Sequence, residues 1–323
     1  MRIAFMGSGW FGVPTLAALC EAGHAVVRVY TQPSRPAGRG GHVRGTPAGE
    51  AARRLGLDVR ECANVNAPEA VAEIRALAAD VIVVVDFGQI MRAPVRGAAA
   101  HGAINLHGSL LPLLRGAAPV NWAMIQGLSV TGVTTFSLVD AVDAGDVYAR
   151  AQTEIDPRET AEELKVRLAE IGAGVMVRTL AAVAAGTRPV PQDHALATSA
   201  PRLTKHDGVI DWARSAEEIR GLVHGTWRWP GGQAVFAGST HTTSVTLARV
   251  ECVPPSCPAG ILPASCLGTV LADGTVVTGD GRLRVLELQP AGKRPMSWKD
   301  FVNGHRVAVG DRFCTPTTGA DTP

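Results

Sequence analysis

Short runs of β-branched residues alternate with stretches of helical periodicity over the first hundred residues. The pattern predicts strands at residues 3–6, 25–30, 57–62, 81–85 and 103–106. Helices are expected between them, at residues 14–22, 49–55 and 67–77. Alternation of this kind is typical of parallel strands joined by helical crossovers. We therefore predict an α/β fold with a Rossmann-like, doubly wound sheet for this part of the chain.

The pattern changes after residue 106. Helices are expected at 117–126 and 159–185, with strands at 130–139 and 147–155 between them. Residues 187–204 are polar and rich in proline, which is typical of a linker. The short strands beyond them, interrupted by glycine and proline, predict a small OB-like β-barrel. We expect a first domain over 1–186, a linker over 187–204, a barrel domain over 205–314 and a disordered tail over 315–323.

Composition narrows the class of protein without defining its function. With 323 residues the chain is long enough for two domains. A net charge of +2 is too small to indicate nucleic-acid binding by itself, so any phosphate-binding surface has to be local. The cysteines form no Cys-x-x-Cys pair, which favours reduced thiols. No signal-peptide pattern opens the chain, and we expect a cytoplasmic protein with no membrane association.

A glycine-rich loop follows the first expected strand. Residues 7–12 read Gly-Ser-Gly-Trp-Phe-Gly, which matches the fingerprint of dinucleotide-binding proteins in its proper context. The second strand, however, ends without the acid that holds a ribose hydroxyl, and Trp10 and Phe11 are bulky for a phosphate loop. Because Arg35 is able to accept a 2′-phosphate, an NADP-dependent oxidoreductase stays open as a remote alternative.

The residues most indicative of chemistry are an amide, an imidazole and a carboxylate. Asn105 and His107 end an expected strand two residues apart, so their side chains share one side of the sheet, and Asp143 lies in an acidic loop. In acyl transfer to an amine, an amide stabilises the oxyanion and an imidazole moves the proton, while a carboxylate supports the imidazole. The same residues also fit structural roles or turns, and the acidic loop weakly resembles part of a calcium loop.

Residues 105–119 resemble the signature of the folate-dependent formyltransferase family. The family's Asn, His and Asp match Asn105, His107 and Asp143, and residues 131–134 and 143–146 match two further family segments. Residues 32–40 and 288–296 resemble segments of the methionyl-tRNA formyltransferase branch. The resemblance implies a Rossmann-like catalytic domain, an OB-like barrel and 10-formyl-tetrahydrofolate as co-substrate, with no metal.

The resemblance also implies two sets of binding residues. Those expected to bind the folate donor are Phe87, Gly88, Gln89, Ile90, Met91, Asp140, Ala141 and Val142. Those expected to bind the acceptor are Gly9, Trp10, Arg39, Ser109, Leu110, Arg115 and Gly116.

The acceptor amine is harder to predict. Chain length, the basic loop over 35–44 and the C-terminal barrel favour initiator methionyl-tRNA. Against it, this loop lacks a lysine cluster, and the barrel carries nearly balanced charge. Residues 7–9 and 119–123 also depart from the tRNA branch. We predict a small-molecule primary amine, either an amino sugar or a precursor of a specialised metabolite. Methionyl-tRNA is the alternative, and formyl-tetrahydrofolate hydrolysis or simple RNA binding are remote ones.

Overall fold

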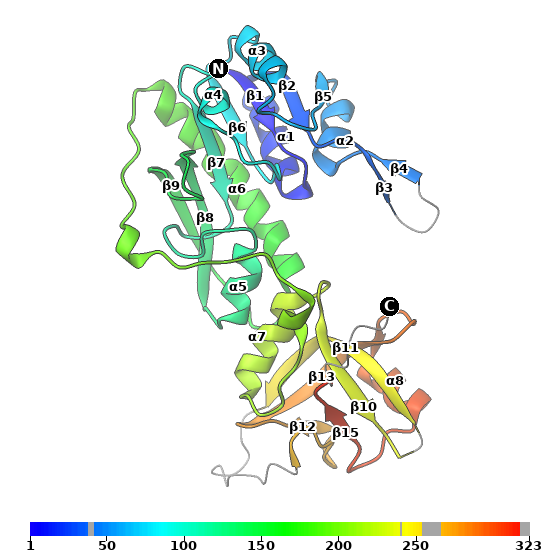
Figure 1. Cartoon of the computed structure of the whole chain (residues 1–323). Helices are drawn as coiled ribbons and strands as arrows, with labels where there is room; N and C mark the ends of the chain where they lie inside the picture. Colours follow the sequence, from blue (N-terminus) through cyan, green and yellow to red (C-terminus); the bar gives the residue numbers. More distant parts are fainter. Residues whose placement is uncertain (38–41, 240, 254–265, 317–323) are drawn as a thin grey trace. The chain divides into compact units, whose positions relative to one another are not determined.

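The computed structural model describes residues 1–37, 42–239, 241–253 and 266–316 (Figure 1). The chain divides into two compact units. The first contains Met1–Pro119, Val130–Glu154 and Lys165–Pro201, and the second contains Val120–Ser129, Ile155–Leu164 and Arg202–Pro323. The predicted boundaries at 186 and 204 assume continuous domains and stay a prediction. Most of the expected tail over 315–323 lies outside the described residues.

The first unit is built on a seven-stranded sheet in the order β5-β2-β1-β6-β7-β8-β9. Its strands are β1 (Arg2–Met6), β2 (Ala25–Thr31), β5 (Val59–Glu61), β6 (Val81–Val84), β7 (Ala103–His107), β8 (Val130–Ser137) and β9 (Val147–Glu154). The first five are parallel, whereas β8 pairs antiparallel with both β7 and β9. All four residues of β6 are buried, as expected for a strand covered on both faces. The predicted α/β fold is confirmed.

Helices and a short hairpin connect these strands. The first unit contains α1 (Val13–Glu21), α2 (Pro47–Arg54), α3 (Pro68–Ala76), α4 (Ala93–Arg96), most of α6 (Ala161–Ala184), the 3-10 turns η1 (Trp10–Gly12) and η2 (His194–Leu196), and the hairpin of β3 (Arg35–Ala37) and β4 (His42–Arg44). Helix α5 (Pro119–Ile125) follows the loop after β7.

The helices leave part of one sheet face to loops. Helix α6 covers β7 and β8 on the face that carries Leu106, because a Cβ at Gly172 would lie 2.6 Å from the Leu106 side chain (Figure 1). The Thr135 and Thr179 hydroxyls bond at 2.7 Å on the same face. Asn105 and His107 alternate with Leu106 and therefore point to the opposite face. Beside His107 this face is covered by loops and not by a helix. A binding site is therefore expected on this part of the sheet.

The second unit contains an antiparallel sheet in the order β12-β13-β11-β10-β15, with β14 paired to β13. Its elements are α7 (Ala216–Thr226), β10 (Gly232–Ala237), β11 (Thr242–Val253), β12 (Thr275–Val277), β13 (Arg282–Pro290), β14 (Met296–Ser297), α8 (Trp298–His305), β15 (Arg312–Cys314) and the turn η3 (Lys205–Gly208). This nearly closed sheet confirms the predicted small barrel.

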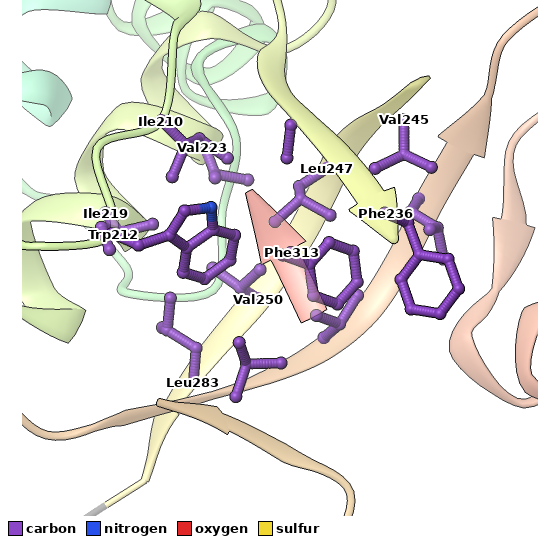
Figure 2. Packing of buried hydrophobic residues seen from close by; sticks show 14 of the residues in the cluster. Ile210, Trp212, Ile219, Val223, Phe236, Val245, Leu247, Val250, Leu283 and Phe313 are labelled. Atoms are coloured by element: carbon purple, nitrogen blue, oxygen red, sulfur yellow. The ribbon is translucent and has the colours of Figure 1, made fainter. Parts of the chain in front are cut away.

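Aromatic rings fill the interior of this barrel. Figure 2 shows Trp212 and Phe313 among aliphatic side chains such as Leu247 and Leu283. The Trp212 and Phe313 rings stack with centroids 5.6 Å apart, and both residues are nearly inaccessible. The sequence pattern missed α7 and α8, although Ser215 and Ser297 cap their first turns.

A neutral histidine is buried where α7 meets β11. His224 is 1% exposed, and its Nε2 accepts a hydrogen bond from the Val250 N–H at 3.1 Å. Burial, with the nearby positive charges of Arg249 and Arg220, lowers the pKa of His224 from 6.5 to about 4. The folded state therefore holds this imidazole uncharged, whereas the unfolded chain takes up a proton near pH 6.5.

We expect acid to destabilise the barrel through His224. The pKa of His224 is lower in the folded state than in the unfolded chain. Neutral His224 therefore contributes fully to the free energy of unfolding above about pH 6.5, and this contribution is lost as the pH falls towards 4. The loss amounts to about 3 kcal/mol. Urea unfolding from pH 4 to 8 should show a shallower pH dependence for His224→Gln than for the wild type. His206→Gln, at an exposed position of the same unit, is the control, and equal slopes in all three proteins would contradict the prediction.

Candidate active site

The imidazole of His107, which the sequence predicts to be catalytic, lies at the C-terminal end of β7. His107 is buried, and the edge of its ring meets the Phe136 ring at 6.4 Å. Its Nε2 lies 2.9 Å from the Leu114 carbonyl oxygen. Because a carbonyl oxygen only accepts, Nε2 carries a hydrogen. In neutral His107 the lone pair is therefore on Nδ1, which faces the Asp143 carboxylate at 3.6 Å. Nδ1 is the nitrogen that exchanges a proton.

The Asp143 carboxylate is held beside this nitrogen by the backbone. The Gly116 N–H donates to Asp143 Oδ2 at 2.8 Å, and this is the oxygen that faces His107. Asp143 itself adopts a left-handed conformation with φ of +50°. Gly145 lets the loop lie flat on the end of β8, since a Cβ there would come within 1.7 Å of the Ser137 carbonyl oxygen. A conformation tolerated by few residue types thus aims the carboxylate at His107.

Asn105 supplies an uncommitted amide on the same face of the sheet. Its partner in β8 is Phe136, whose ring also contacts His107. The side chain is half-buried and makes no hydrogen bond to any residue that the structure describes. The structure thus brings together the three predicted catalytic side chains. A free donor, a proton-exchanging nitrogen and a supporting carboxylate are what acyl transfer to an amine requires.

Most of the predicted acceptor residues in the loop after β7 stabilise that loop. The buried Ser109 hydroxyl donates to the Leu113 carbonyl at 2.6 Å, and Arg115 Nη2 donates to Gln192 Oε1 at 2.7 Å. Gly116 lies close to the Ala200 carbonyl: a Cβ added at residue 116 would be 2.5 Å from the Ala200 oxygen, so a larger residue does not fit there. Leu110 differs, because it lines an open hollow of about 650 Å³ together with residues such as Arg150.

The two predicted folate loops are joined by one arginine that sequence reasoning missed. Arg96 donates from Nη1 to the Met91 carbonyl at 2.6 Å, and its Nη2 lies 2.8 Å from Asp140 Oδ1. Ile90 and Val142, one from each loop, are 76% and 61% exposed. Apolar side chains left in solvent on adjoining loops are typical of a ligand-binding surface. Arg96 stands in a four-residue helix, and nothing in its local pattern indicates this contact.

The remaining folate residues shape their loops from within. Phe87 is buried, and Gly88 has a φ of +77°, which favours glycine. The Gln89 amide bonds to the Val65 N–H and to the Cys62 carbonyl, both at 2.8 Å. Ala141 is exposed beside Val142.

The glycine loop after β1 does not offer its amides to a phosphate. The N–H groups of Ser8 and Gly9 both donate to the Asp86 carbonyl, at 2.9 and 3.0 Å. The Asp86 carboxylate also lies directly over Gly9, where a Cβ would fall 1.5 Å from Oδ2. With two of its donors occupied and the Asp86 side chain filling the space over Gly9, the loop is unsuited to a pyrophosphate. Trp10 packs edge-on against Phe11, and Arg39 lies outside the described residues.

Two further kinds of feature are absent from the described residues. They contain no group of three or more His, Cys, Asp or Glu side chains placed to hold a metal ion. No helix among them is both long and apolar enough to span a bilayer.

Fold and site together define a two-domain acyl-transfer enzyme with an amine acceptor. The chain belongs to the formyl transferase family: residues 1–180 match the family described as "Formyl transferase", and residues 202–306 match "Formyl transferase, C-terminal domain". Membership confirms the predicted class, a folate-dependent formyltransferase that uses 10-formyl-tetrahydrofolate as co-substrate.

Full-length relatives correct the predicted acceptor. The methionyl-tRNA formyltransferase of Solibacter usitatus is 40% identical over 97% of this chain and 98% of its own length. That of Symbiobacterium thermophilum is 41% identical over 98% and 96%. Since these relatives share both domains with the chain and carry the tRNA name, the expectation of a small-molecule amine is wrong. That expectation rested on a missing lysine cluster, a barrel of balanced charge and departures at residues 7–9 and 119–123, and identity along nearly the whole chain outweighs these local features.

Solved structures share the fold at low identity. An N-formyltransferase from Helicobacter canadensis, in complex with folinic acid and dTDP-3-aminofucose, has a TM-score of 0.64 at 11% identity over 90% of this chain and 99% of its own. HypX from Aquifex aeolicus, in complex with tetrahydrofolic acid, has a TM-score of 0.62 at 16% identity over 96% of this chain and 48% of its own. At these identities the likeness concerns the fold alone.

We expect Gly145→Ala to lower turnover by about a hundredfold, because a catalytic group moved by about 1 Å loses that much. The added Cβ collides with the Ser137 carbonyl and pushes the Asp143 loop off β8. Formyl transfer at saturating substrates measures the effect. Gly174→Ala, in α6, meets only the end of the Arg178 side chain and serves as the matched control. Similar turnover in both variants would refute the importance of this contact.

Proposed function

We propose that this protein transfers the formyl group of 10-formyl-tetrahydrofolate to the amino group of methionyl-tRNA. The observation that carries the proposal is the match at about 40% identity, along nearly the whole length of both chains, to proteins named methionyl-tRNA formyltransferase. The uncommitted Asn105 amide and the facing pair of His107 and Asp143 supply the chemistry that this reaction needs.

The reaction exchanges one carbon–nitrogen bond for another. The acceptor nitrogen bonds to the formyl carbon and loses a proton, and the folate nitrogen gains a proton as its bond to that carbon breaks. In between, the formyl oxygen carries negative charge. The Asn105 amide donates a hydrogen bond to this oxygen, in a largely buried setting where such a bond is strong.

His107 carries the proton between the two nitrogens. Leu114 keeps a hydrogen on Nε2, so Nδ1 takes the proton from the acceptor and delivers it to the leaving nitrogen. Asp143 lies 3.6 Å from Nδ1 and stabilises the imidazolium that forms in between. That separation is longer than a hydrogen bond, so the lone pair of neutral His107 is free to receive the acceptor's proton.

Two loops fit the folate donor. Exposed Ile90 and Val142 offer apolar contact to a flat ring, and the backbone of both loops offers polar groups. Arg96 spans the loops, so their separation is fixed before the donor binds. Phe87, Gly88, Gln89, Met91, Asp140 and Ala141 complete the proposed donor site.

The hairpin of β3 and β4 supports a polyanionic acceptor. Arg35 and Arg44 are opposite each other in its register, and both are exposed. Like charges placed side by side repel each other unless an anion lies between them. They are nine positions apart in sequence, so the hairpin creates a concentrated positive charge that the net charge of the chain conceals. Gly9, Trp10 and Leu110 are the other described residues proposed to bind the acceptor, and Arg39, which lies outside the described residues, stays a candidate from the sequence alone.

We expect Asn105→Ala to lower turnover by about a hundredfold or more, since it removes an oxyanion donor. His107→Ala and Asp143→Ala should also lower turnover strongly while the thermal unfolding midpoint stays near that of the wild type. Single-turnover formyl transfer with methionyl-tRNA gives the rates. Full turnover in Asn105→Ala with only weaker donor affinity would refute its role, and near-normal turnover in the other two would refute the relay.

We expect folate release from 10-formyl-tetrahydrofolate to require charged initiator tRNA. Uncharged tRNA should bind without turnover, since it lacks the amine. Binding of either form should weaken steeply with salt, because Arg35 and Arg44 contact phosphates. Arg35→Ala combined with Arg44→Ala should flatten that salt dependence and raise the KM for tRNA. Donor binding without turnover on methionyl-tRNA would contradict the proposed acceptor.

A further inference from the structure

We propose that Gln192 is a positioning residue for the catalytic carboxylate, and that residues 191–200 clamp the loop that carries Asp143. The proposal rests on the proposed function, because it assigns these residues a role in the same formyl transfer. The sequence pattern had placed residues 187–204 in a linker, but the structure packs part of this segment onto the active-site loops.

The Gln192 side-chain amide forms hydrogen bonds to the Asp143 loop on both sides of Ala144. Its Nε2 donates to the Asp143 carbonyl at 2.9 Å and to the Gly145 carbonyl at 2.6 Å. An amide NH₂ has two hydrogens, so both are used. Gln192 is 5% exposed, so neither bond competes freely with water.

The loop needs such support because of the conformation of Asp143. A φ of +50° is disfavoured for any residue with a side chain, so an unrestrained loop would relax away from it. Relaxation would rotate the carboxylate away from the Gly116 N–H and from His107, which it contacts at 2.8 and 3.6 Å. By fixing the carbonyl of Asp143, Gln192 fixes the direction of its side chain.

Arg115 orients Gln192 and closes the network. Its Nη2 donates to Gln192 Oε1 at 2.7 Å, which turns the NH₂ group towards the Asp143 loop. The next residue is Gly116, whose N–H holds the Asp143 carboxylate. One chain of contacts therefore runs from Arg115 through Gln192 to the backbone of Asp143, and returns through its carboxylate to Gly116.

The backbone of residues 198–200 is fastened to a second loop, the one after β7, whose Gly116 holds the Asp143 carboxylate. The Arg115 N–H donates to the Thr198 carbonyl at 2.8 Å, and the Ala200 N–H donates to the Arg115 carbonyl at 2.7 Å. The Thr198 hydroxyl also accepts from the Leu114 N–H at 2.8 Å. Leu114 is the residue whose carbonyl holds His107 Nε2, so the clamp fixes both members of the proton relay.

Two variants separate positioning from mere packing. Gln192→Ala removes every amide contact. Gln192→Glu keeps the length and the Arg115 partner, but it turns an oxygen towards the Asp143 and Gly145 carbonyls. We expect each to lower kcat on methionyl-tRNA by about tenfold or more. Gln233→Ala is the matched control, because it also removes a glutamine amide, which donates from Nε2 to the Lys205 carbonyl at 3.0 Å, but lies in the second unit outside the clamp.

The decisive readout is the coupling between Gln192 and Asp143. If Gln192 acts through the carboxylate, Gln192→Ala lowers the single-turnover rate of the wild type but leaves that of Asp143→Asn within about twofold. Losses that multiply in the double variant would overturn the proposal. So would wild-type kcat in Gln192→Ala, or an equal loss in Gln233→Ala.

Amide hydrogen exchange tests whether Gln192 holds the Asp143 loop, and the measurement needs no acceptor. The Gly116 amide is protected by the Asp143 carboxylate, so Gln192→Ala should speed its exchange by about tenfold or more, while exchange in β6 stays unchanged. Unchanged exchange at Gly116 would overturn the proposal. The wild type could show no formyl transfer to methionyl-tRNA while Gly116 exchange still accelerates in Gln192→Ala. That result would refute the proposed acceptor and support the positioning role of Gln192.

Discussion

The site depends on holding the Asp143 carboxylate 3.6 Å from His107 Nδ1, in a backbone conformation that the residue would not choose alone. Three separate parts of the first unit meet to hold it. The loop after β7 supplies the Gly116 N–H, the end of β8 supplies a flat surface under Gly145, and Gln192 supplies its amide. A carboxylate aimed in this way needs little reorganisation when the imidazole gains its proton. The geometry is therefore prepared before any substrate arrives.

The glycine loop illustrates how one fold serves a different chemistry. In a dinucleotide-binding protein, the amides after the first strand bind a pyrophosphate. Here the Asp86 carbonyl takes two of those amides, and its carboxylate covers Gly9. The sequence keeps the glycine pattern because the tight turn between β1 and α1 still needs small residues. The backbone N–H groups of Ser8 and Gly9, however, are used in hydrogen bonds within the protein. The proposed catalytic side chains lie instead at the end of β7, where loops replace a helix on the sheet.

The acceptor was the property that sequence reasoning judged wrongly. The basic loop over 35–44 favours tRNA, but its lack of a lysine cluster and the balanced charge of the barrel argue against RNA when each segment is considered as a whole. The structure shows that register matters more than composition, since the β3–β4 pairing sets Arg35 opposite Arg44. Phosphate binding responds to local charge density, which a sum over the chain averages away. Likeness over the full length of curated relatives was needed to correct the error.

The sequence by itself determined the two kinds of sheet and the placement of Asn105 and His107, two of the three proposed catalytic side chains, on one face of a strand. Strand periodicity and crossover helices are local properties, and Asn105 and His107 share a face because side chains alternate along a strand. Only the tertiary structure decided which side chains support them. Arg96 and Gln192 are far in sequence from Asp140 and Asp143, and their contacts arise when separate loops are packed at one edge of the sheet. Such contacts leave no periodic signal, because they are made by single residues whose neighbours in sequence point elsewhere.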